Sequence, residues 1–234
     1  MADKQKQAKG KSICLDGPTV YRLLESKVSI DRKDFVVHVP EAEKDPFLAL
    51  VAIILSQNTN DKNSIRALRS LLSIGSTPED FLRVGAERIM DAIRISGGYR
   101  RKTETILRLS KFLIEKGGTR YLVETDPGLL REELSKIKGI GPKTVDVFLS
   151  FYRGVRVFPV DTHARRIAWR WGLVSKPSVS YKLVSSSLAD FFGDTVDYEK
   201  AHKLIISFGR SICRARNPRC EICPLKKCCP SARS

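Results

Sequence analysis

The sequence predicts a mainly α-helical protein. Apolar residues recur at intervals of three and four along most of the chain, which is the spacing of amphipathic helices. Glycines separate these segments, and the alternation typical of half-buried strands is nearly absent. Hydrophobic residues make up 42% of the 234 residues, which is enough for a core in one domain or in two modest ones.

The elements are predicted in order along the chain. Residues 1–12 form a basic polar tail that we expect to be disordered. Asp45 followed by Pro46 marks a helix start, and the helix behind it is apolar on nearly every face, so we expect it at the centre of a core. Helices are also predicted at 19–30, 65–74, 78–84, 86–95, 102–116, from Pro142, at 162–171, 181–192 and 198–208.

The charge of the chain points to a polyanionic partner. Its formal net charge is +16, and so many cations repel one another unless phosphates or counterions neutralise them. Nucleic acid is therefore favoured over a membrane, because the longest apolar run, residues 47–55, is about half of what a bilayer requires. The polar start shows no secretory signal, so we expect an intracellular, non-secreted protein whose six cysteines favour a metal site over disulfides.

A central stretch, residues 134–171, is interpreted as the place where DNA is held and cut. It contains a glycine hairpin made of Gly139, Ile140 and Gly141. The hairpin opens into a helix at Pro142, and the amides of such a turn form an anion site for a backbone phosphate. Lys143 lies in the first turn of this helix, and Asp161 occupies the N-cap of the next one.

Two polar segments could also contact DNA. Residues 56–63 carry amide and hydroxyl side chains that could reach bases or phosphates, although the residues alone favour a polar helix terminus and turn. Residues 97–102 are a basic turn with a tyrosine, which is typical either of a nucleic-acid contact or of a solvated helix cap.

The C-terminal cysteines predict a metal centre. Cys213, Cys220, Cys223 and Cys229 follow the spacing C-x6-C-x2-C-x5-C, and four thiolates so close in sequence can enclose one centre. Zinc and an iron–sulfur cluster both suit sulfur ligands. Cys228 could replace Cys229 by spacing. The cations inside the loop, Arg214, Arg216 and Arg219, make it a predicted phosphate-binding surface.

The side chains of the central stretch suggest a reaction. An amine that attacks the anomeric carbon of a nucleotide displaces the base and leaves a Schiff base, which permits β-elimination. Lys143 suits this role, although a phosphate-contacting or solvated lysine is the plainer interpretation. A neighbouring carboxylate can stabilise the positive charge that develops on the sugar. Asp146, one turn beyond Lys143, is a weaker catalytic candidate or an ion-pair partner.

Together, the hairpin, Lys143, the sequence VDTH with Asp161, and the cysteine spacing resemble the endonuclease III branch of the helix-hairpin-helix DNA glycosylases. The resemblance implies an all-α protein of two helical domains with a DNA-binding cleft between them. It implies a six-helix barrel at 41–150, and an iron–sulfur domain from 13–40 and 151–234 that holds a 4Fe-4S cluster through Cys229 as the fourth ligand.

The same resemblance assigns individual roles. Asp161 becomes the acid/base and charge stabiliser, and Gln57 helps to fill the gap that a flipped base leaves. Gly98 stands where relatives carry a bulky apolar residue, which leaves open what wedges the opposite strand. Relatives with Tyr or Ser in place of Lys143 lack the strong lyase step.

The predicted function is a monomeric, bifunctional DNA glycosylase/AP lyase that removes oxidised pyrimidines from double-stranded DNA. Two alternatives remain at this point. One is a monofunctional glycosylase for uracil or thymine opposite guanine, and the other is a DNA-binding protein without activity. Lys143 argues against the first, and the presence of both Lys143 and Asp161 argues against the second.

Overall fold

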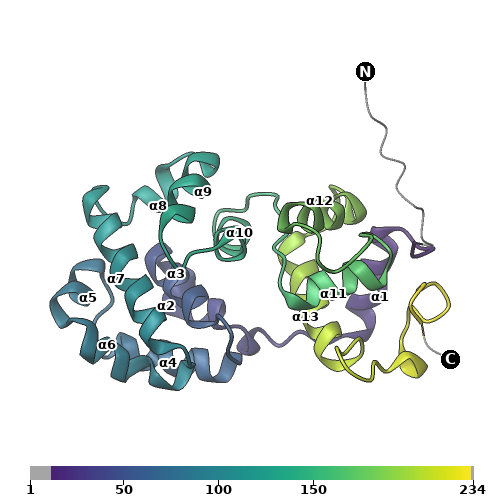
Figure 1. Ribbon diagram of the computed structural model, residues 1–234, viewed down its shortest axis with the longest axis horizontal. Helices are drawn as coiled ribbons and strands as arrows, with labels where there is room; N and C mark the ends of the chain where they lie inside the picture. Colours follow the sequence, from purple (N-terminus) through teal and green to yellow (C-terminus); the bar gives the residue numbers. More distant parts are fainter. Residues whose placement is uncertain (1–11, 233–234) are drawn as a thin grey trace. The chain divides into compact units, whose positions relative to one another are not determined.

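The computed structural model describes residues 12–232, and no strand occurs among them (Figure 1). The prediction of an α-helical protein is therefore confirmed. The chain divides into two compact units. One, the continuous unit, runs from Asp31 to Val155, and the other, the split unit, combines the residues up to Ile30 with those from Arg156 onward. No helix in the described part is long and apolar enough to cross a membrane.

The continuous unit is built from short helices joined by tight turns. Its α-helices are α2 (Pro40–Lys44), α3 (Pro46–Leu55), α4 (Asp61–Leu72), α5 (Pro78–Val84), α6 (Ala86–Ile93), α7 (Tyr99–Glu115), α8 (Tyr121–Glu124), α9 (Pro127–Lys136) and α10 (Pro142–Phe151). Three 3-10 segments, η1 (Arg32–Asp34), η2 (Val36–His38) and η3 (Arg94–Ser96), complete it.

Helix α3 forms the centre of the continuous unit, as predicted from its composition. The carboxylate of Asp45 accepts a hydrogen bond from the Leu48 amide at 2.8 Å, and Pro46 occupies the first turn. Every residue from Phe47 to Leu55 is buried. Helix α3 packs against α2, α4, α7 and α10, which explains why it needs no polar face (Figure 1).

Helices α8 and α9 were not expected from the sequence. Asp126 caps α9 by accepting hydrogen bonds from the amides of Gly128 and Leu129, at 2.8 and 3.1 Å. Pro127 follows in the first turn. The start signal is therefore present, but Leu129 is half exposed and the apolar stripe is short. Helix α9 matters because it is the first helix of the pair that the glycine hairpin joins.

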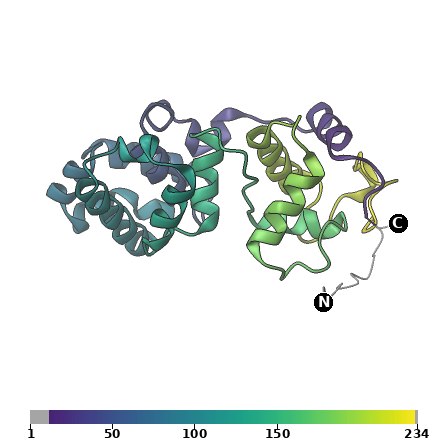
Figure 2. The ribbon, with the colours of Figure 1, turned by 90° about the horizontal axis from the view of Figure 1, so that it is seen from above.

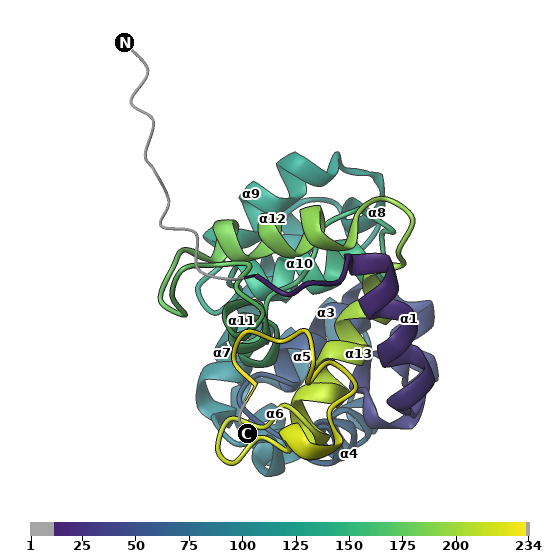
Figure 3. The same cartoon turned by 90° about the vertical axis from the view of Figure 1, so that its right-hand side faces the viewer.

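The split unit gathers helices from both ends of the chain. They are α1 (Gly17–Lys27), α11 (Thr162–Arg170), α12 (Tyr181–Phe192), α13 (Tyr198–Ser211) and the 3-10 segment η4 (Cys220–Ile222). Helix α11 packs against α13, and α1 packs against both α12 and α13 (Figure 3). Stacked rings of Phe158 and Phe192, 5.4 Å apart, and the buried Trp171 lie in its core.

The C-terminal loop lies beside the segment that precedes α1 (Figure 2). The amide of Cys14 donates to the Cys228 carbonyl at 3.3 Å, and the two side chains form a disulfide. The amide of Ile13 donates to the Trp171 carbonyl at 2.8 Å. The expectation that metal binding would be the role of the cysteine set is thus incomplete, because one pair is a disulfide that ties the two ends of the split unit together.

Lys102 is a buried cation, although the sequence places it in an exposed basic turn. Helix α7 starts at Tyr99, three residues before the predicted start, and its first turn directs Lys102 inward. Lys102 is only 4% exposed, and its Nζ atom donates to the carbonyls of Leu55 and Ser96, both at 2.8 Å. The ammonium thus caps the ends of α3 and η3. The interpretation of Lys102 as part of a surface contact is wrong.

The buried ammonium predicts a pH-dependent stability. Burial lowers the pKa of Lys102 from 10.5 to about 8, so its charge is costly in the folded protein. Below about pH 8 the folded protein bears this cost in full. Between about pH 8 and pH 10 the unfolded chain binds more protons than the folded protein, so the cost falls and the free energy of unfolding rises. Chemical denaturation should show the wild-type protein gaining stability over this range.

Lys102→Met is the matched variant for this measurement. It should lose this gain, and at neutral pH it should be less stable by about 1–3 kcal/mol, because the two carbonyls lose their donor. Equal pH dependence in the two proteins would contradict the role assigned to the buried charge.

Candidate functional site

The glycine hairpin between α9 and α10 is held tightly against α7. The amide of Ile140 donates to the Ile137 carbonyl at 2.9 Å and closes the turn, while the Ile140 side chain is buried. Gly139 has a φ of +104°, and a Cβ atom built on it would lie 1.9 Å from Oγ1 of Thr105. Only glycine satisfies both conditions. The sequence predicts a close approach of this backbone to a binding partner. In the structure, Gly139 makes such a close approach to Thr105 of the same protein.

Helix α10 starts without a side-chain cap in the described structure. Gly141 is its N-cap residue and is exposed, and Pro142 follows in the first turn. A Cβ atom on Gly141 would meet nothing within 4 Å. The first amides of α10 therefore face an open surface, which is the arrangement that binds anions at helix N-termini. Lys143 lies in this turn and is half exposed.

Gln57 contacts the hairpin directly. Its Nε2 atom donates to the Gly139 carbonyl at 3.1 Å and to Oγ1 of Thr144 at 3.0 Å. Gln57 lies just beyond α3, whose last carbonyl, that of Leu55, is capped by Lys102. The structure therefore brings the predicted residue Gln57 and the hairpin together, with Thr144 next to Lys143 in the chain.

Asp146 has a structural role. Its side chain is only 1% exposed, and its carboxylate forms an ion pair with Arg131 of α9. A carboxylate buried in this way links the two helices that flank the hairpin. The weaker catalytic assignment of Asp146 is thus not supported by its position, and its ion-pair partner is Arg131.

Asp161 caps α11 in the split unit. Oδ1 accepts a hydrogen bond from the Ala164 amide at 2.7 Å, and the residue is half exposed. Burial lowers the pKa of the nearby His163 below its usual value, although the Asp161 carboxylate opposes this shift. This shift favours the neutral form of His163. Lys143 belongs to the continuous unit, so the two predicted catalytic residues come from different units.

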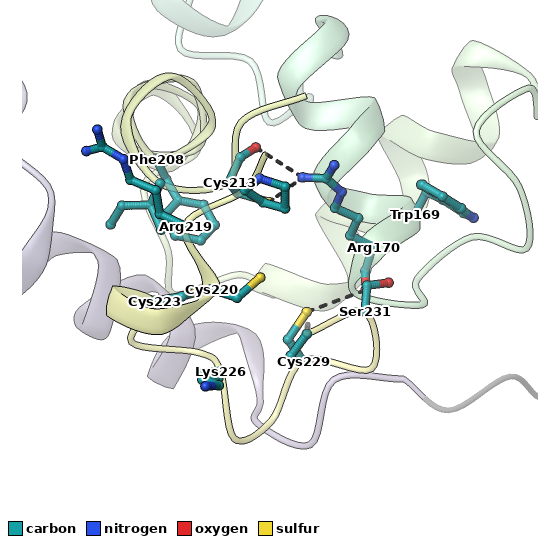
Figure 4. A pocket seen from close by; sticks show the side chains of 13 residues that line it. Trp169, Arg170, Phe208, Cys213, Arg219, Cys220, Cys223, Lys226, Cys229 and Ser231 are labelled. Carbon is teal, nitrogen blue, oxygen red and sulfur yellow. Dashed lines mark hydrogen bonds between the residues drawn. The ribbon is translucent and has the colours of Figure 1, made fainter. Parts of the chain in front are cut away.

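The predicted metal ligands line one cavity. It has a volume of about 130 Å³ and lies between the ends of α11 and α13 and the C-terminal loop (Figure 4). Its walls include the four free cysteines of the described chain: Cys213, Cys220, Cys223 and Cys229. Cys228 forms a disulfide and so has no free thiol. Of the two cysteines that the spacing allowed as the fourth ligand, the structure therefore favours Cys229.

The chemistry of these thiols fits a bound metal centre. Burial raises the pKa of Cys223 to about 11 and also raises that of Cys229, and the other sulfurs of the set add to both shifts. Burial thus disfavours the ionised form of these two thiols, and a bound cation would compensate the charge of thiolates in such a cavity. Within residues 12–232, no three Cys, His, Asp or Glu side chains are grouped as ligands of a single metal ion.

Two arginines of α11 attach this helix to the cysteine loop. Nη1 of Arg170 donates to Sγ of Cys213 at 3.2 Å (Figure 4). It also donates to the Arg214 carbonyl at 2.8 Å. Arg166 donates to the carbonyls of Cys213 and Gly209, at 3.2 and 3.0 Å. The sequence analysis missed both residues. Their spacing of four, on a helix that starts at Asp161, was the available signal.

The predicted phosphate-binding arginines differ in exposure. Arg216 and Arg219 are exposed at the surface of the loop, whereas Arg214 is half buried and donates to the Asn217 carbonyl at 3.2 Å. Lys226 and Lys227 are exposed as well. The loop therefore carries several exposed cations around a cysteine-lined cavity, whereas Arg214 mainly stabilises the loop itself.

Comparison with known proteins agrees with this arrangement. Residues 51–191 match the model of the HhH-GPD superfamily of base excision DNA repair proteins. Endonuclease III of Thermotoga maritima is 35% identical over 80% of this chain and 84% of its own length. Endonuclease III of Sulfolobus acidocaldarius is 32% identical over 90% and 93%.

A solved structure adds to these matches. It is a trapped covalent intermediate of an endonuclease III with DNA, the estranged-adenine complex, and it aligns with a TM-score of 0.74 and 28% identity over 93% of this chain and 97% of that chain. The fold and the paired helices thus define a helix-hairpin-helix protein of base excision repair. Within that superfamily, the chain belongs to the endonuclease III family.

The two hairpin glycines predict different outcomes. Gly139→Ala should lower the free energy of unfolding by about 2–4 kcal/mol, because it combines a clash with Thr105 and an unfavourable positive φ. Gly141→Ala should change it by less than about 0.5 kcal/mol, since its backbone is extended and the added methyl group is unopposed. Thermal and urea unfolding of both variants measure this, and equal losses would contradict the proposed packing of the hairpin.

Proposed function

We propose that this protein is a bifunctional DNA glycosylase/AP lyase that removes oxidised pyrimidines from duplex DNA and cleaves the strand by β-elimination. The observation that carries the proposal is the start of α10, where an uncapped, open helix end and a half-exposed lysine follow the hairpin directly. Family membership supplies the reaction class. The protein acts as a monomer.

Phosphates of the damaged strand bind at the hairpin. The exposed Gly141 lets the backbone approach a phosphate closely, and the first amides of α10 donate to it. The buried side chain of Ile140 anchors the turn in the protein, and Gly139 lets the turn pack closely on α7. The exposed Arg216 and Arg219 of the cysteine loop supply further phosphate contacts from the split unit.

The target nucleotide leaves the base stack before it reacts, and Gln57 occupies part of the space it leaves. Support comes from the contacts of Gln57 with Gly139 and Thr144, since these hydrogen bonds hold the amide side chain beside the phosphate site and beside Lys143. The side chain is thus fixed before DNA arrives. A fixed side chain loses less entropy on binding than a mobile one.

Lys143 is the nucleophile. Its neutral amine attacks C1′ of the flipped nucleotide, the glycosidic bond breaks, and the base leaves with the bonding electron pair and is protonated. The amine then loses a proton, the C1′–O4′ bond breaks with a proton going to O4′, and the opened sugar is left as a Schiff base. This acidifies the C2′ proton, whose removal expels the 3′ phosphate. Asp161 stabilises the positive charge on the sugar and moves the protons, and its cap bond to Ala164 through Oδ1 orients its carboxylate.

Cys213, Cys220, Cys223 and Cys229 hold a 4Fe-4S cluster in this proposal. The shared cavity and the unfavourable ionisation of its thiols support a cationic metal centre, and the family supports iron and sulfide over zinc. The cluster is structural when bound, because four protein ligands leave no open position. The four cysteines would in this way hold in place the loop that carries the exposed Arg216 and Arg219.

Borohydride trapping tests the proposed reaction. The protein is incubated with a duplex that carries one thymine glycol and with a duplex that carries one abasic site. Both should give a covalent adduct, and Lys143→Gln should give none. Lys111→Gln, an exposed lysine of α7, removes the same charge and should trap like the wild type. Both variants should bind the duplex with an affinity within about threefold of the wild type, because each loses only one positive charge.

The remaining outcomes separate the alternatives. An adduct on the abasic site alone would contradict the oxidised-pyrimidine substrate and retain the lyase. No adduct on either duplex would contradict the bifunctional reaction and leave a monofunctional glycosylase or a binding protein, which base release from the thymine glycol duplex then distinguishes.

Iron content tests the ligand set. Cys229→Ser should lower bound iron and the visible absorption of the purified protein, because one of four ligands is lost. Cys228→Ser and Cys14→Ser remove the disulfide instead and should keep the iron of the wild type. A colourless, zinc-loaded wild type would overturn the iron–sulfur assignment, and loss of iron in Cys228→Ser with retention in Cys229→Ser would exchange the two ligands.

A further inference from the structure

Tyr181 is the first residue of α12, and its hydroxyl meets the backbone just before Asp161. The amide of Val160 donates to the hydroxyl oxygen of Tyr181 at 3.1 Å. Val160 is buried, and the Tyr181 ring packs against the core of the split unit. A side chain from a different helix therefore holds the peptide that leads into the proposed catalytic carboxylate.

The position of Tyr181 relative to α11 is fixed by two further sets of bonds. Ser180 caps α12 by accepting a hydrogen bond from the Leu183 amide at 3.2 Å. Nη1 of Arg165, on α11, donates to the carbonyls of Pro177 and Val179, at 3.0 and 2.6 Å. The loop that precedes Tyr181 is thus tied to the same helix that Asp161 caps. The phenol has little freedom to move away from the start of α11.

The direction of the Val160 bond assigns the phenol's own proton. A hydroxyl oxygen that accepts an N–H still carries one O–H to donate. The residue after Val160 is Asp161, and an ionised carboxylate accepts several hydrogen bonds, of which the Ala164 amide supplies one. We propose that Tyr181 is a positioning residue for Asp161, whose hydroxyl accepts the Val160 amide and donates to the Asp161 carboxylate. This inference rests on the proposed function, in which Asp161 acts as a carboxylate.

Charged and titratable groups around Asp161 are distinct from this donor. His163 and Arg166 lie on its own helix and interact with it electrostatically. Arg210 of α13 interacts with His163. Tyr181 reaches the same region from α12 and brings no formal charge. Removing its hydroxyl therefore changes the hydrogen bonding of Asp161 while leaving the net charge of the surroundings as it was.

Tyr181→Phe tests the proposal through the pH dependence of base excision. Without the O–H donor the ionised carboxylate is less favoured, so the acidic limb of the single-turnover excision rate on thymine glycol should move to higher pH by about one unit. At a pH on that limb the rate should fall about tenfold, and near the alkaline plateau it should approach the wild-type rate. The unfolding temperature is measured alongside.

Tyr198→Phe is the matched control. The Tyr198 hydroxyl donates to the Ala189 carbonyl at 2.9 Å within the same unit, so its removal also deletes one phenolic hydrogen bond. It should lower stability to a similar degree and leave the acidic limb in place. If both variants show the wild-type limb, or shift it equally, Tyr181 has only a structural role and the proposal is overturned.

Fluorotyrosine at position 181 gives a second test that keeps the hydroxyl and the fold. A more acidic phenol donates more strongly, so the acidic limb should move to lower pH, opposite to the shift in Tyr181→Phe. Movement in the same direction, or none, would contradict donation to Asp161. Failure of the proposed function is distinguishable, because then the wild-type protein itself would not excise thymine glycol, or Asp161→Asn would excise it at the wild-type rate.

Discussion

The backbone of Gly139 lies so close to Thr105 that no side chain fits between them, and the candidate DNA surface of the continuous unit depends on this approach. It brings the hairpin onto α7, one of the helices that enclose α3. The hydrogen bonds of Gln57 then connect the hairpin to the end of α3. Lys102 connects that same end to the turn before α7. A rigid surface results, although its parts come from three separate stretches of the chain.

Such rigidity has a consequence for how the site would bind DNA. The direction of the amides at the start of α10 is set by the hairpin before them, which packs directly on α7. An anion site built from fixed dipoles needs no reorganisation when a phosphate arrives. Lys143 shares the same turn, so the group that would react is positioned by the group that would bind. Hairpin and nucleophile are in this sense one structural element.

Much of this could be read from the sequence because the signals were local. Asp45-Pro46, Gly139 to Gly141 and Asp161 each act within one helix start, and each behaves as its residue type predicts. Lys102 could not be read in this way, since its acceptors lie 47 and 6 residues away and depend on how α3, η3 and α7 meet. Thr105 and Tyr181 were missed for the same reason.

The cysteine loop shows the limit of spacing most clearly. Spacing left Cys228 and Cys229 equivalent. A contact of Cys228 with Cys14, 214 residues earlier in the chain, favours Cys229 as the ligand, as the family resemblance also does. The family relation then supplies what neither spacing nor packing contains, which is the identity of the metal centre.

Helix α11 joins two features of the split unit that seem unrelated in sequence. Its first turn is capped by Asp161, and its later turns carry Arg166 and Arg170, which bind the carbonyls and a sulfur of the cysteine loop. A guanidinium group can form several hydrogen bonds in one plane, so the two arginines hold the loop to the helix at several points. Tyr181 of α12 binds the Val160 amide just before this helix, and Arg165 on the helix binds the Val179 carbonyl in the segment that leads into α12. The helix that Asp161 caps is therefore held at two places, by the cysteine loop and by the segment around the start of α12. An order imposed on the loop by a metal centre would be transmitted along α11 through side chains that are already in contact.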